Sequence, residues 1–358
     1  MKRTYNFNAG PAAIPLAVLE KAQSELVDFN GTGMSVMELS HRSKPYEEVH
    51  NRAASLLREL MEIPEDYEVL FLQGGASLQF AMIPMNFLKD GSSAHFIMSG
   101  VWSEKAQSEA GKLGSTTIIA TSKEDRYTYI PESFEDPEEG SYVHLTSNNT
   151  IYGTQWGKFP STKLPLIADM SSDIMSREID VSRFSLIYAG AQKNLGPSGV
   201  TVVIVKKEML ENANEDIPAI LKYSTHSKQN SLYNTPPTFA IYMLSLVLEW
   251  MQDKGGLKAI EELNKKKASL LYSCIDQSGG FYKGHAEKDS RSAMNVTFTL
   301  KDENLTKVFL KESIEKGFSG LGGHRSIGGC RASIYNAVPL EACEALAEFM
   351  AEFQKKHE

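Results

Sequence analysis

The 358-residue chain is poor in cysteine and has no long hydrophobic run. Its three cysteines, Cys274, Cys330 and Cys343, lack the paired spacing of zinc or redox motifs, so neither a metal site nor a disulfide framework is expected. The longest apolar stretch, 239–248, is too short to span a bilayer, and no secretory apolar segment stands near residue 1. These absences predict a cytoplasmic protein.

The chain also has no excess of positive charge, since its net charge is −8. Neither nucleic acid nor an anionic membrane is therefore expected as its main partner. Two nucleotide-binding motifs are absent as well. Residues 73–77 stand where a strand meets a helix, but they lack the third glycine of GxGxxG and the Gly-Lys-Ser/Thr of a P-loop. Nicotinamide and nucleoside triphosphate ligands are not favoured.

What the chain does contain, from about residue 67, is an alternation of apolar strands and amphipathic helices. The expected strands are 69–72, 94–98, 116–120, 142–145, 164–168, 186–189 and 200–205. Helices are expected at 15–29, 44–61, 77–88, 102–113, 206–212, 236–252 and 257–277. This order predicts an α/β protein with a mostly parallel sheet covered by helices on both faces.

The length of the chain and the glycine-containing break at residues 254–256 favour two domains. Residues 15–255 are expected to form a large domain around the seven-stranded sheet. Residues 256–358 are expected to form a smaller C-terminal α/β domain, packed with the N-terminal segment 1–14. Its expected elements are a strand at 293–300, a helix at 304–316, a strand at 331–335 and a helix at 340–355.

Lys193 lies in a tight segment of small residues between two expected strands. Such a hairpin would hold its ammonium in a crowded, partly dry site, where the pKa of a lysine can fall. Asp169 ends an apolar run upstream. Pyridoxal phosphate chemistry needs an amine for the cofactor aldehyde and a carboxylate that keeps the pyridine nitrogen protonated. In isolation, an Asp at the end of a strand more commonly binds Mg²⁺ or caps a helix, but Lys193 favours the cofactor.

Three other segments follow strands at the same expected edge of the sheet. Ala76 and Ser77 stand at a helix N-terminus, whose free N–H groups suit a phosphate dianion; the alternative is a plain turn. Trp102 could stack on a flat heterocycle or pack at a domain boundary. Thr150 could bond a phenolic oxygen, although most Asn/Thr loops are only turns.

The chain contains two His-Arg pairs, His41-Arg42 and His324-Arg325, and a further arginine, Arg331, after the second pair. The second pair lies in a glycine-rich segment that we expect to be a flexible loop able to fold over a ligand. An isolated pair is usually a surface feature. Two pairs with Arg331, in a chain of negative charge, indicate a ligand with more than one anionic group.

Nearly end to end, the chain resembles the phosphoserine aminotransferases of the class V pyridoxal-phosphate-dependent family. The most specific segments are Ala-Gly-Ala-Gln-Lys-Asn at 189–194 and Arg-Ala-Ser-Ile-Tyr-Asn at 331–336. Others are 8–13, 41–43, 74–77, 147–154 and 322–325. The resemblance implies fold type I and a homodimer with its sites at the subunit interface.

The resemblance also implies the reaction. Amino transfer from L-glutamate to 3-phosphohydroxypyruvate would give O-phospho-L-serine and 2-oxoglutarate, in L-serine biosynthesis. The sequence leaves open whether 4-phosphohydroxy-L-threonine, for pyridoxine biosynthesis, is also a product. One pyridoxal 5'-phosphate per subunit would form a Schiff base with Lys193.

Residue roles carry over by position. The cofactor would be held by Asp169 at the pyridine nitrogen, Trp102 by stacking, Thr150 at the ring substituents, and Ala76, Ser77 and Gln192 at the phosphate. Asn234 and Thr235 would complete the phosphate site from the other subunit. Arg331 would bind the α-carboxylate, and His41, Arg42, His324 and Arg325 the distal phosphate or γ-carboxylate. Some members carry an Arg where this chain has Ser77, and that Arg helps to bind the substrate phosphate. Without it, the two His-Arg pairs would contribute more of the binding to that phosphate.

Three rival functions stay open on the residues alone. A cysteine desulfurase-like lyase would need a reactive cysteine on a mobile loop. Cys330 is near such a loop, but Trp102 and Gln192 stand where desulfurases generally carry His. A transaminase using glyoxylate would be expected to lack the doubled His-Arg pairs. A non-catalytic dimeric scaffold would have no reason to keep Lys193 with Asp169.

Overall fold

The computed structural model describes residues 3–358 and has a seven-stranded sheet at its centre. The strand order is β2 (Tyr67–Leu72), β10 (Thr201–Lys206), β9 (Leu186–Gly190), β8 (Leu166–Asp169), β5 (Tyr142–Thr146), β3 (Ser93–Met98) and β4 (Ser115–Thr121). Only β10 runs against its neighbours, β2 and β9. The predicted mostly parallel sheet is confirmed, and the expected hairpin around Lys193 is the β9–β10 connection.

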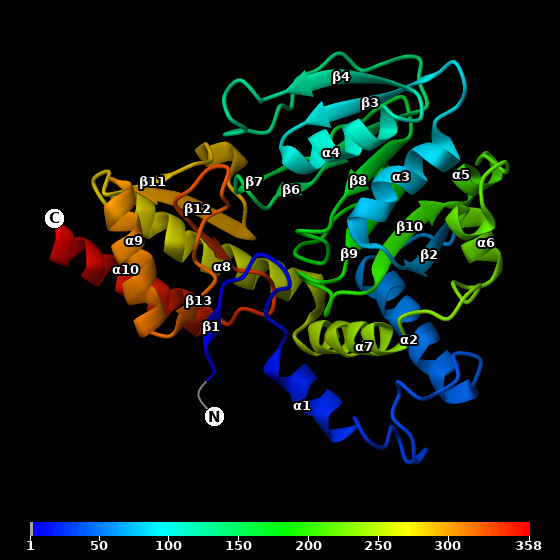
Figure 1. Cartoon of the computed structure of the whole chain (residues 1–358), viewed down its shortest axis with the longest axis horizontal. Coiled ribbons are helices and arrows are strands. Elements are labelled where there is room, and N and C mark those ends of the chain that lie inside the picture. Colours follow the sequence, from blue (N-terminus) through cyan, green and yellow to red (C-terminus); the bar gives the residue numbers. More distant parts are fainter. Residues whose placement is uncertain (1–2) are drawn as a thin grey trace.

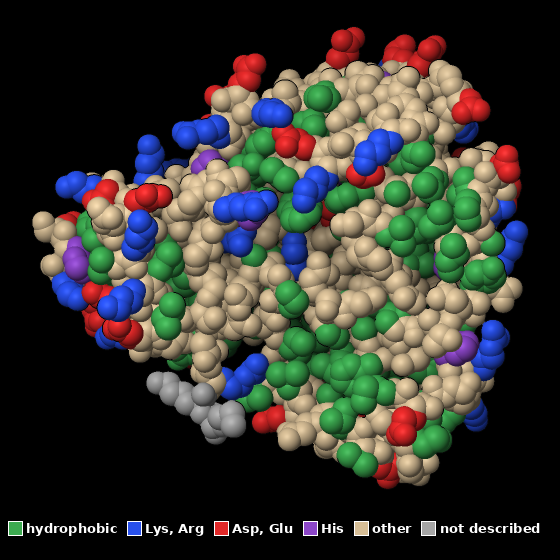
Figure 2. Space-filling view, viewed as in Figure 1, with side chains coloured by type: hydrophobic (Ala, Val, Ile, Leu, Met, Phe, Trp, Pro, Cys, Tyr) green, Lys and Arg blue, Asp and Glu red, His purple; other side chains and the backbone are tan. Residues whose placement is uncertain are grey.

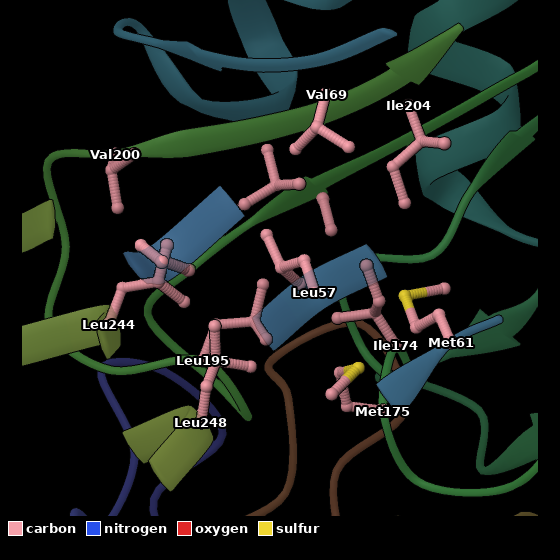
Figure 3. Packing of buried hydrophobic residues seen from close by; sticks show 14 of the residues in the cluster. Leu57, Met61, Val69, Ile174, Met175, Leu195, Val200, Ile204, Leu244 and Leu248 are labelled. Carbon is pink, nitrogen blue, oxygen red and sulfur yellow. The ribbon is translucent and has the colours of Figure 1, made fainter. Parts of the chain in front are cut away.

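Helices cover both faces of this sheet (Figure 1). One face packs on α2 (Lys44–Leu60) and α7 (Thr238–Asp253), and the other on α3 (Gly75–Phe87) and α4 (Val101–Ala110). Side chains of β10 alternate between the two layers: Val202 and Ile204 face α2 and α7, while Val203 and Val205 face α3. Figure 3 shows the first layer, in which Leu57 of α2 lies below Val69 of the sheet and Leu244 of α7 lies on the side of Val200.

The C-terminal part has a separate hydrophobic core. Its antiparallel sheet contains β11 (Tyr282–Gly284), β12 (Asn295–Leu300) and β14 (Cys330–Ser333). It packs on α8 (Gly256–Gln277), α9 (Glu303–Glu315) and α10 (Leu340–His357). The N-terminal β1 (Tyr5–Asn6) pairs with β13 (Phe318–Ser319), and Phe7 is buried in this second core. The division at residue 255 itself stays a prediction.

The remaining elements are short. They are α1 (Leu16–Ser24), α5 (Lys207–Glu211), α6 (Tyr223–Lys228), β6 (Asn148–Asn149), β7 (Thr154–Gln155) and the 3-10 helices Val181–Arg183, Ala219–Leu221 and Lys288–Ser290. Among the described residues, no helix is long and apolar enough to cross a membrane.

The first helix is shorter than its apolar spacing predicts, because it stops at Ser24 instead of continuing to Phe29. Beyond it the chain turns: the Gly33 N–H donates to the Asp28 carboxylate at 2.7 Å, and Asn30 adopts a φ of 51°. Val27, which a longer helix would have carried, is 82% exposed. Local turn chemistry outweighs the helical spacing here.

Candidate active site

The loops after the parallel strands enclose a cavity of about 300 Å³ at the carboxyl edge of the sheet. Ligands of open α/β sheets gather at this edge. Nine predicted site residues line the cavity together: Ala76, Ser77, Trp102, Thr150, Asp169, Gln192, Lys193, His324 and Arg331. They come from segments far apart in the sequence, so the fold confirms that these side chains meet.

Lys193 lies in the β9–β10 connection, and its amine is held at the cavity by two hydroxyls. Lys193 Nζ is 2.8 Å from Thr150 Oγ1 and 2.6 Å from Ser172 Oγ, and these two oxygens are 2.6 Å apart. Burial lowers the pKa of Lys193 to about 8, although the Asp169 carboxylate acts in the opposite direction. A lysine poised in this way has an accessible neutral form near neutral pH.

Asp169 is the last residue of β8, and only 5% of it is exposed. Burial raises its pKa, while hydrogen bonds from Ser171 and the charge of Lys193 oppose that rise. The Ser171 N–H donates to Asp169 Oδ1 at 2.9 Å. On the neighbouring strand β9, Tyr188 is paired in register with Asp169, and the Tyr188 hydroxyl lies 2.9 Å from His144 Nε2. The carboxylate is therefore fixed in place at the wall of the cavity.

The N-terminus of α3 is built to leave backbone N–H groups free. Gly74 and Gly75 have φ values of 84° and 64°, and no side chain caps the helix. A Cβ on Gly74 would lie 2.6 Å from Leu78 Cβ, so the turn requires glycine. The first-turn N–H groups, including those of Ala76 and Ser77, have no acceptor within the helix and suit an anionic oxygen.

Trp102 lines the cavity from the first turn of α4. Its Nε1 is buried and has no hydrogen-bond partner among residues 3–358. The Lys105 ammonium lies 4.4 Å from the centre of the indole, within range of a cation–π contact. The ring is therefore positioned as a flat wall, which suits stacking on a heterocycle.

The C-terminal part contributes the cationic end of the cavity. Arg331, in β14, donates from Nη1 to the Thr150 carbonyl at 3.2 Å. Its Nε is buried and unpartnered within the described chain, which leaves part of the guanidinium fork free for a ligand. His324 Nδ1 lies 2.7 Å from Ser326 Oγ. Burial and the nearby cations Arg331, Arg325 and Lys105 lower the pKa of His324.

Five predicted site residues do not line this cavity: His41, Arg42, Asn234, Thr235 and Arg325. All are exposed at the surface except His41, which is half-buried. The segment that carries His41 and Arg42 lies between α1 and α2, at the lower edge of Figure 1. The Thr235 carbonyl accepts a hydrogen bond from Gln73 Nε2 at 3.1 Å. Their roles stay predictions.

The glycine-rich segment 317–329 is partly ordered by backbone pairing. The Gly323 N–H donates to the Gly329 carbonyl, and the Arg331 N–H to the Leu321 carbonyl. Its expected flexibility stays a prediction. Figure 2 shows Lys and Arg side chains, with a histidine, gathered near the middle of this face, between α4 and the C-terminal part.

Sequence reasoning missed Ser172, Ser171 and Lys105. Ser172 contacts the amine directly, and Ser171 orients Asp169. A signal was present, because the two serines come two and three residues after Asp169, the carboxylate that ends its strand. Lys105 follows Trp102 by one helical turn, a spacing that places two side chains on the same face.

These residues fit pyridoxal phosphate. A free N-terminal helix turn suits its phosphate, the Trp102 indole suits its ring, and the Lys193 amine suits its aldehyde. The buried Asp169 carboxylate gains a partner if it meets a protonated ring nitrogen. The unpartnered Nε atoms of Trp102 and Arg331 show that the lining holds unused donors.

Residues 4–346 match the family model of the class-V aminotransferases. The chain belongs to this family. The match confirms the resemblance seen in the sequence, and with it a pyridoxal-phosphate-dependent transaminase of the expected α/β fold.

Individual relatives sharpen the comparison. The chain is 67% identical to the phosphoserine aminotransferase of Bacillus subtilis strain 168, over the full length of both. A phosphoserine aminotransferase structure in which radiation damage of the Schiff base was studied superposes with a TM-score of 0.98 at 59% identity, over 99% of this chain and 100% of that one. The PLP-bound phosphoserine aminotransferase of Trichomonas vaginalis gives 0.93 at 39% identity, over 98% and 100%.

Proposed function

We propose that this aminotransferase moves the amino group of L-glutamate to 3-phosphohydroxypyruvate, giving O-phospho-L-serine and 2-oxoglutarate for L-serine biosynthesis. The observation that carries the proposal is the cavity in which Lys193, Asp169 and Arg331 meet. The names of relatives aligned over the whole chain support the substrate pair. A cytoplasmic location and a second product for pyridoxine biosynthesis stay predictions from the sequence.

Pyridoxal phosphate, when bound, supplies an aldehyde that combines with amines and a ring that accepts electrons from the substrate carbon. Lys193 Nζ is the amine that would hold this aldehyde, one cofactor per subunit. With Nζ free as an amine, Lys193 would be the group that takes the proton from the substrate Cα. The hydroxyls of Thr150 and Ser172 keep Nζ within reach of that position.

Asp169 would hold the ring nitrogen in its protonated, positive form. Its carboxylate is buried, so a positive partner at that point removes the cost of an uncompensated charge. The α3 N-terminus, with Ala76 and Ser77, would hold the phosphate group, and Gln192 lies on the same wall. Trp102 would stack on the ring and exclude water from its face.

Arg331 would bind the α-carboxylate that both substrates share. Its free Nε and its second Nη nitrogen can form a bidentate pair with a carboxylate. His324 and Arg325 would meet the distal phosphate of one substrate and the γ-carboxylate of the other. Both distal groups are anions, so one cationic end of the cavity can serve both half-reactions.

A second copy of the chain would complete both ends of the cavity, with Arg42 at the distal anion and Asn234 and Thr235 at the cofactor phosphate. Arg42, Asn234 and Thr235 are exposed and lie outside their own cavity, so they can serve a ligand only from a partner. The segment that carries Arg42 also exposes large apolar side chains that a homodimer interface would cover: Leu26, Val27, Met34 and Met37. Figure 2 shows hydrophobic side chains gathered on the lower part of the molecule, around α7.

The desulfurase alternative is disfavoured by Cys330. Its side chain is 1% exposed and packed in the C-terminal core, and burial raises the pKa of its thiol to about 12. A thiol of this kind is unreactive, whereas a desulfurase needs an accessible thiolate.

The test is a pair of half-reactions on the purified holoenzyme. L-glutamate should bleach the visible absorbance of the bound cofactor, and 3-phosphohydroxypyruvate should restore it. Hydroxypyruvate, which lacks the phosphate, should restore the absorbance at least about tenfold more slowly, because the distal cations are left unpaired. Equal recovery with both ketoacids would contradict the phosphate-selective assignment.

A further inference from the structure

Behind the cavity, a buried network of three asparagines and one lysine joins the segments that follow Asp169, Lys193 and Arg331. Its members are Asn194, Asn264, Asn336 and Lys267, and at most 5% of each residue is exposed. None of them lines the cavity. The proposed chemistry uses none of them, so their burial calls for a separate explanation.

Asn336 is the centre of this network. Its backbone N–H donates to Asn194 Oδ1 at 3.0 Å, and its Nδ2 donates to the Met175 carbonyl at 2.8 Å. Its Oδ1 accepts from Asn264 Nδ2 at 2.8 Å. The side chain therefore bonds at both ends to separate parts of the fold, and no apolar residue could replace these two side-chain contacts, whereas the backbone N–H contact to Asn194 would remain.

The large-domain side of the network is rigid. Asn194 follows Lys193 directly, and its Nδ2 donates to the Ile174 carbonyl at 2.9 Å. Asn264 donates to the Ser176 carbonyl at 3.0 Å. Figure 3 shows the side chains of Ile174, Met175 and Leu195 in the hydrophobic cluster under the sheet, so this side cannot shift without disturbing the core.

Lys267 fastens the other side. Its ammonium is fully buried in α8 and donates to the carbonyls of Ile334, Tyr335 and Val338 at 2.9, 2.8 and 3.1 Å. All three protons of the ammonium are thereby used. The three carbonyls belong to the segment that follows β14, and each of them gains a hydrogen-bond donor. Removing the ammonium would leave those carbonyls buried without it.

We propose that Asn336, anchored by Lys267, is a positioning residue that fixes Arg331 relative to Lys193 and Asp169. The segment from Arg331 to Asn336 spans from the cavity to the network, and Asn194 is the chain neighbour of Lys193. The substrate α-carboxylate is held at one end and its Cα must meet Lys193 Nζ at the other. The network sets the distance between Arg331 and Lys193 Nζ, so it contributes to the reaction by holding the substrate in the correct geometry.

This inference rests on the proposed function for the role of Arg331. The test uses holoenzyme and two measurements: dissociation of 2-oxoglutarate by calorimetry, in the absence of an amino donor, and kcat/KM for both substrates. For Asn336→Ala we expect normal cofactor content, a Kd for 2-oxoglutarate about tenfold higher, and a kcat/KM about 10- to 100-fold lower. Lys267→Met should change both in the same direction.

Lys266→Met is the matched control, because Lys266 is the exposed neighbour of Lys267 on the same helix. It should leave both measurements unchanged. If Lys267→Met fails to fold, Asn336→Ala decides the question. Variants that only lose thermal stability, with wild-type Kd and kcat/KM, would overturn the positioning role. A wild-type protein that binds 2-oxoglutarate but does not aminate 3-phosphohydroxypyruvate would instead overturn the proposed reaction.

Discussion

The cofactor end and the distal end of the cavity differ in how much of each one chain supplies. At the cofactor end, Lys193 Nζ donates to the hydroxyls of Thr150 and Ser172 at 2.8 and 2.6 Å, and the Ser171 N–H donates to the Asp169 carboxylate at 2.9 Å. At the distal end, Arg42 and Arg325 are exposed, and only His324 reaches the wall. One chain therefore holds the reacting amine and its carboxylate, whereas the predicted roles of Asn234 and Thr235 at the cofactor phosphate and of Arg42 at the distal anion need a second copy.

The largest effect is expected at the cofactor end. Lys193→Ala removes both the amine for the cofactor and the base at the substrate Cα, so turnover should fall by about 10⁴-fold or more. The visible absorbance of the purified protein should change with it. Lys112→Ala, a change of an exposed lysine paired with Glu109, is the control. A Lys193→Ala protein with normal turnover would contradict the assignment of the reacting amine to the cofactor end of the cavity.

Asp169→Asn tests the second fixed group. Loss of the buried charge should leave the cofactor bound and lower kcat by about 10²- to 10³-fold, because the ring loses its electrostatic partner. Asp173→Asn is a demanding control: Asp173 is also buried, but it is paired with Gln155 and Arg177 and does not line the cavity. Single-turnover rates should separate the two variants, and equal losses would point to a general effect of buried charge.

Arg331→Gln tests the junction between the two ends. The variant keeps some hydrogen-bonding capacity but loses the charge and the fork. KM should rise about 10- to 100-fold for both substrates, since both present an α-carboxylate. Steady-state kinetics with each substrate in turn measures this. An increase for only one of the two would show that Arg331 reads the distal group instead.

The smallest expected effect is a change in how the free energy of unfolding depends on pH. Burial lowers the pKa of Lys193 to about 8 in the folded protein, against an ordinary value of 10.5. Between these values the unfolded chain keeps a proton that the folded chain has lost, so the free energy of unfolding gains a contribution that rises with pH. Its slope is at most about 1.4 kcal/mol per pH unit.

Denaturant titrations of cofactor-free protein from pH 7 to 10.5 measure this slope. The difference between wild type and Lys193→Met isolates the contribution of this lysine from that of Lys267, whose pKa burial also lowers to about 8. A difference that does not change with pH would show that the Lys193 amine titrates normally.

Seven of the nine predicted cofactor residues line one cavity, for a physical reason; Asn234 and Thr235 do not, and the roles of all nine stay predictions. Asp169, Trp102 and Thr150 each follow an apolar parallel strand, and such strands must end at one edge. Ser172 was missed although it comes shortly after the strand that ends in Asp169, and the asparagine network was not predicted, since hydrogen bonds between distant amides leave no periodic trace. The first helix was predicted too long, because Leu26 and Phe29 continue the helical spacing after turn residues have ended the helix.

The distal end could be predicted only as a set of residue types, because our proposal takes Arg42 from a second copy of the chain. The central claim is therefore best tested by mixing two inactive variants, Lys193→Ala and Arg42→Ala, in equal amounts during refolding. If Arg42 serves the partner's cavity, hybrid dimers contain one intact site, and the mixture should regain about one quarter of wild-type activity with 3-phosphohydroxypyruvate. No recovery beyond the sum of the two separate variants would contradict a site shared between two copies.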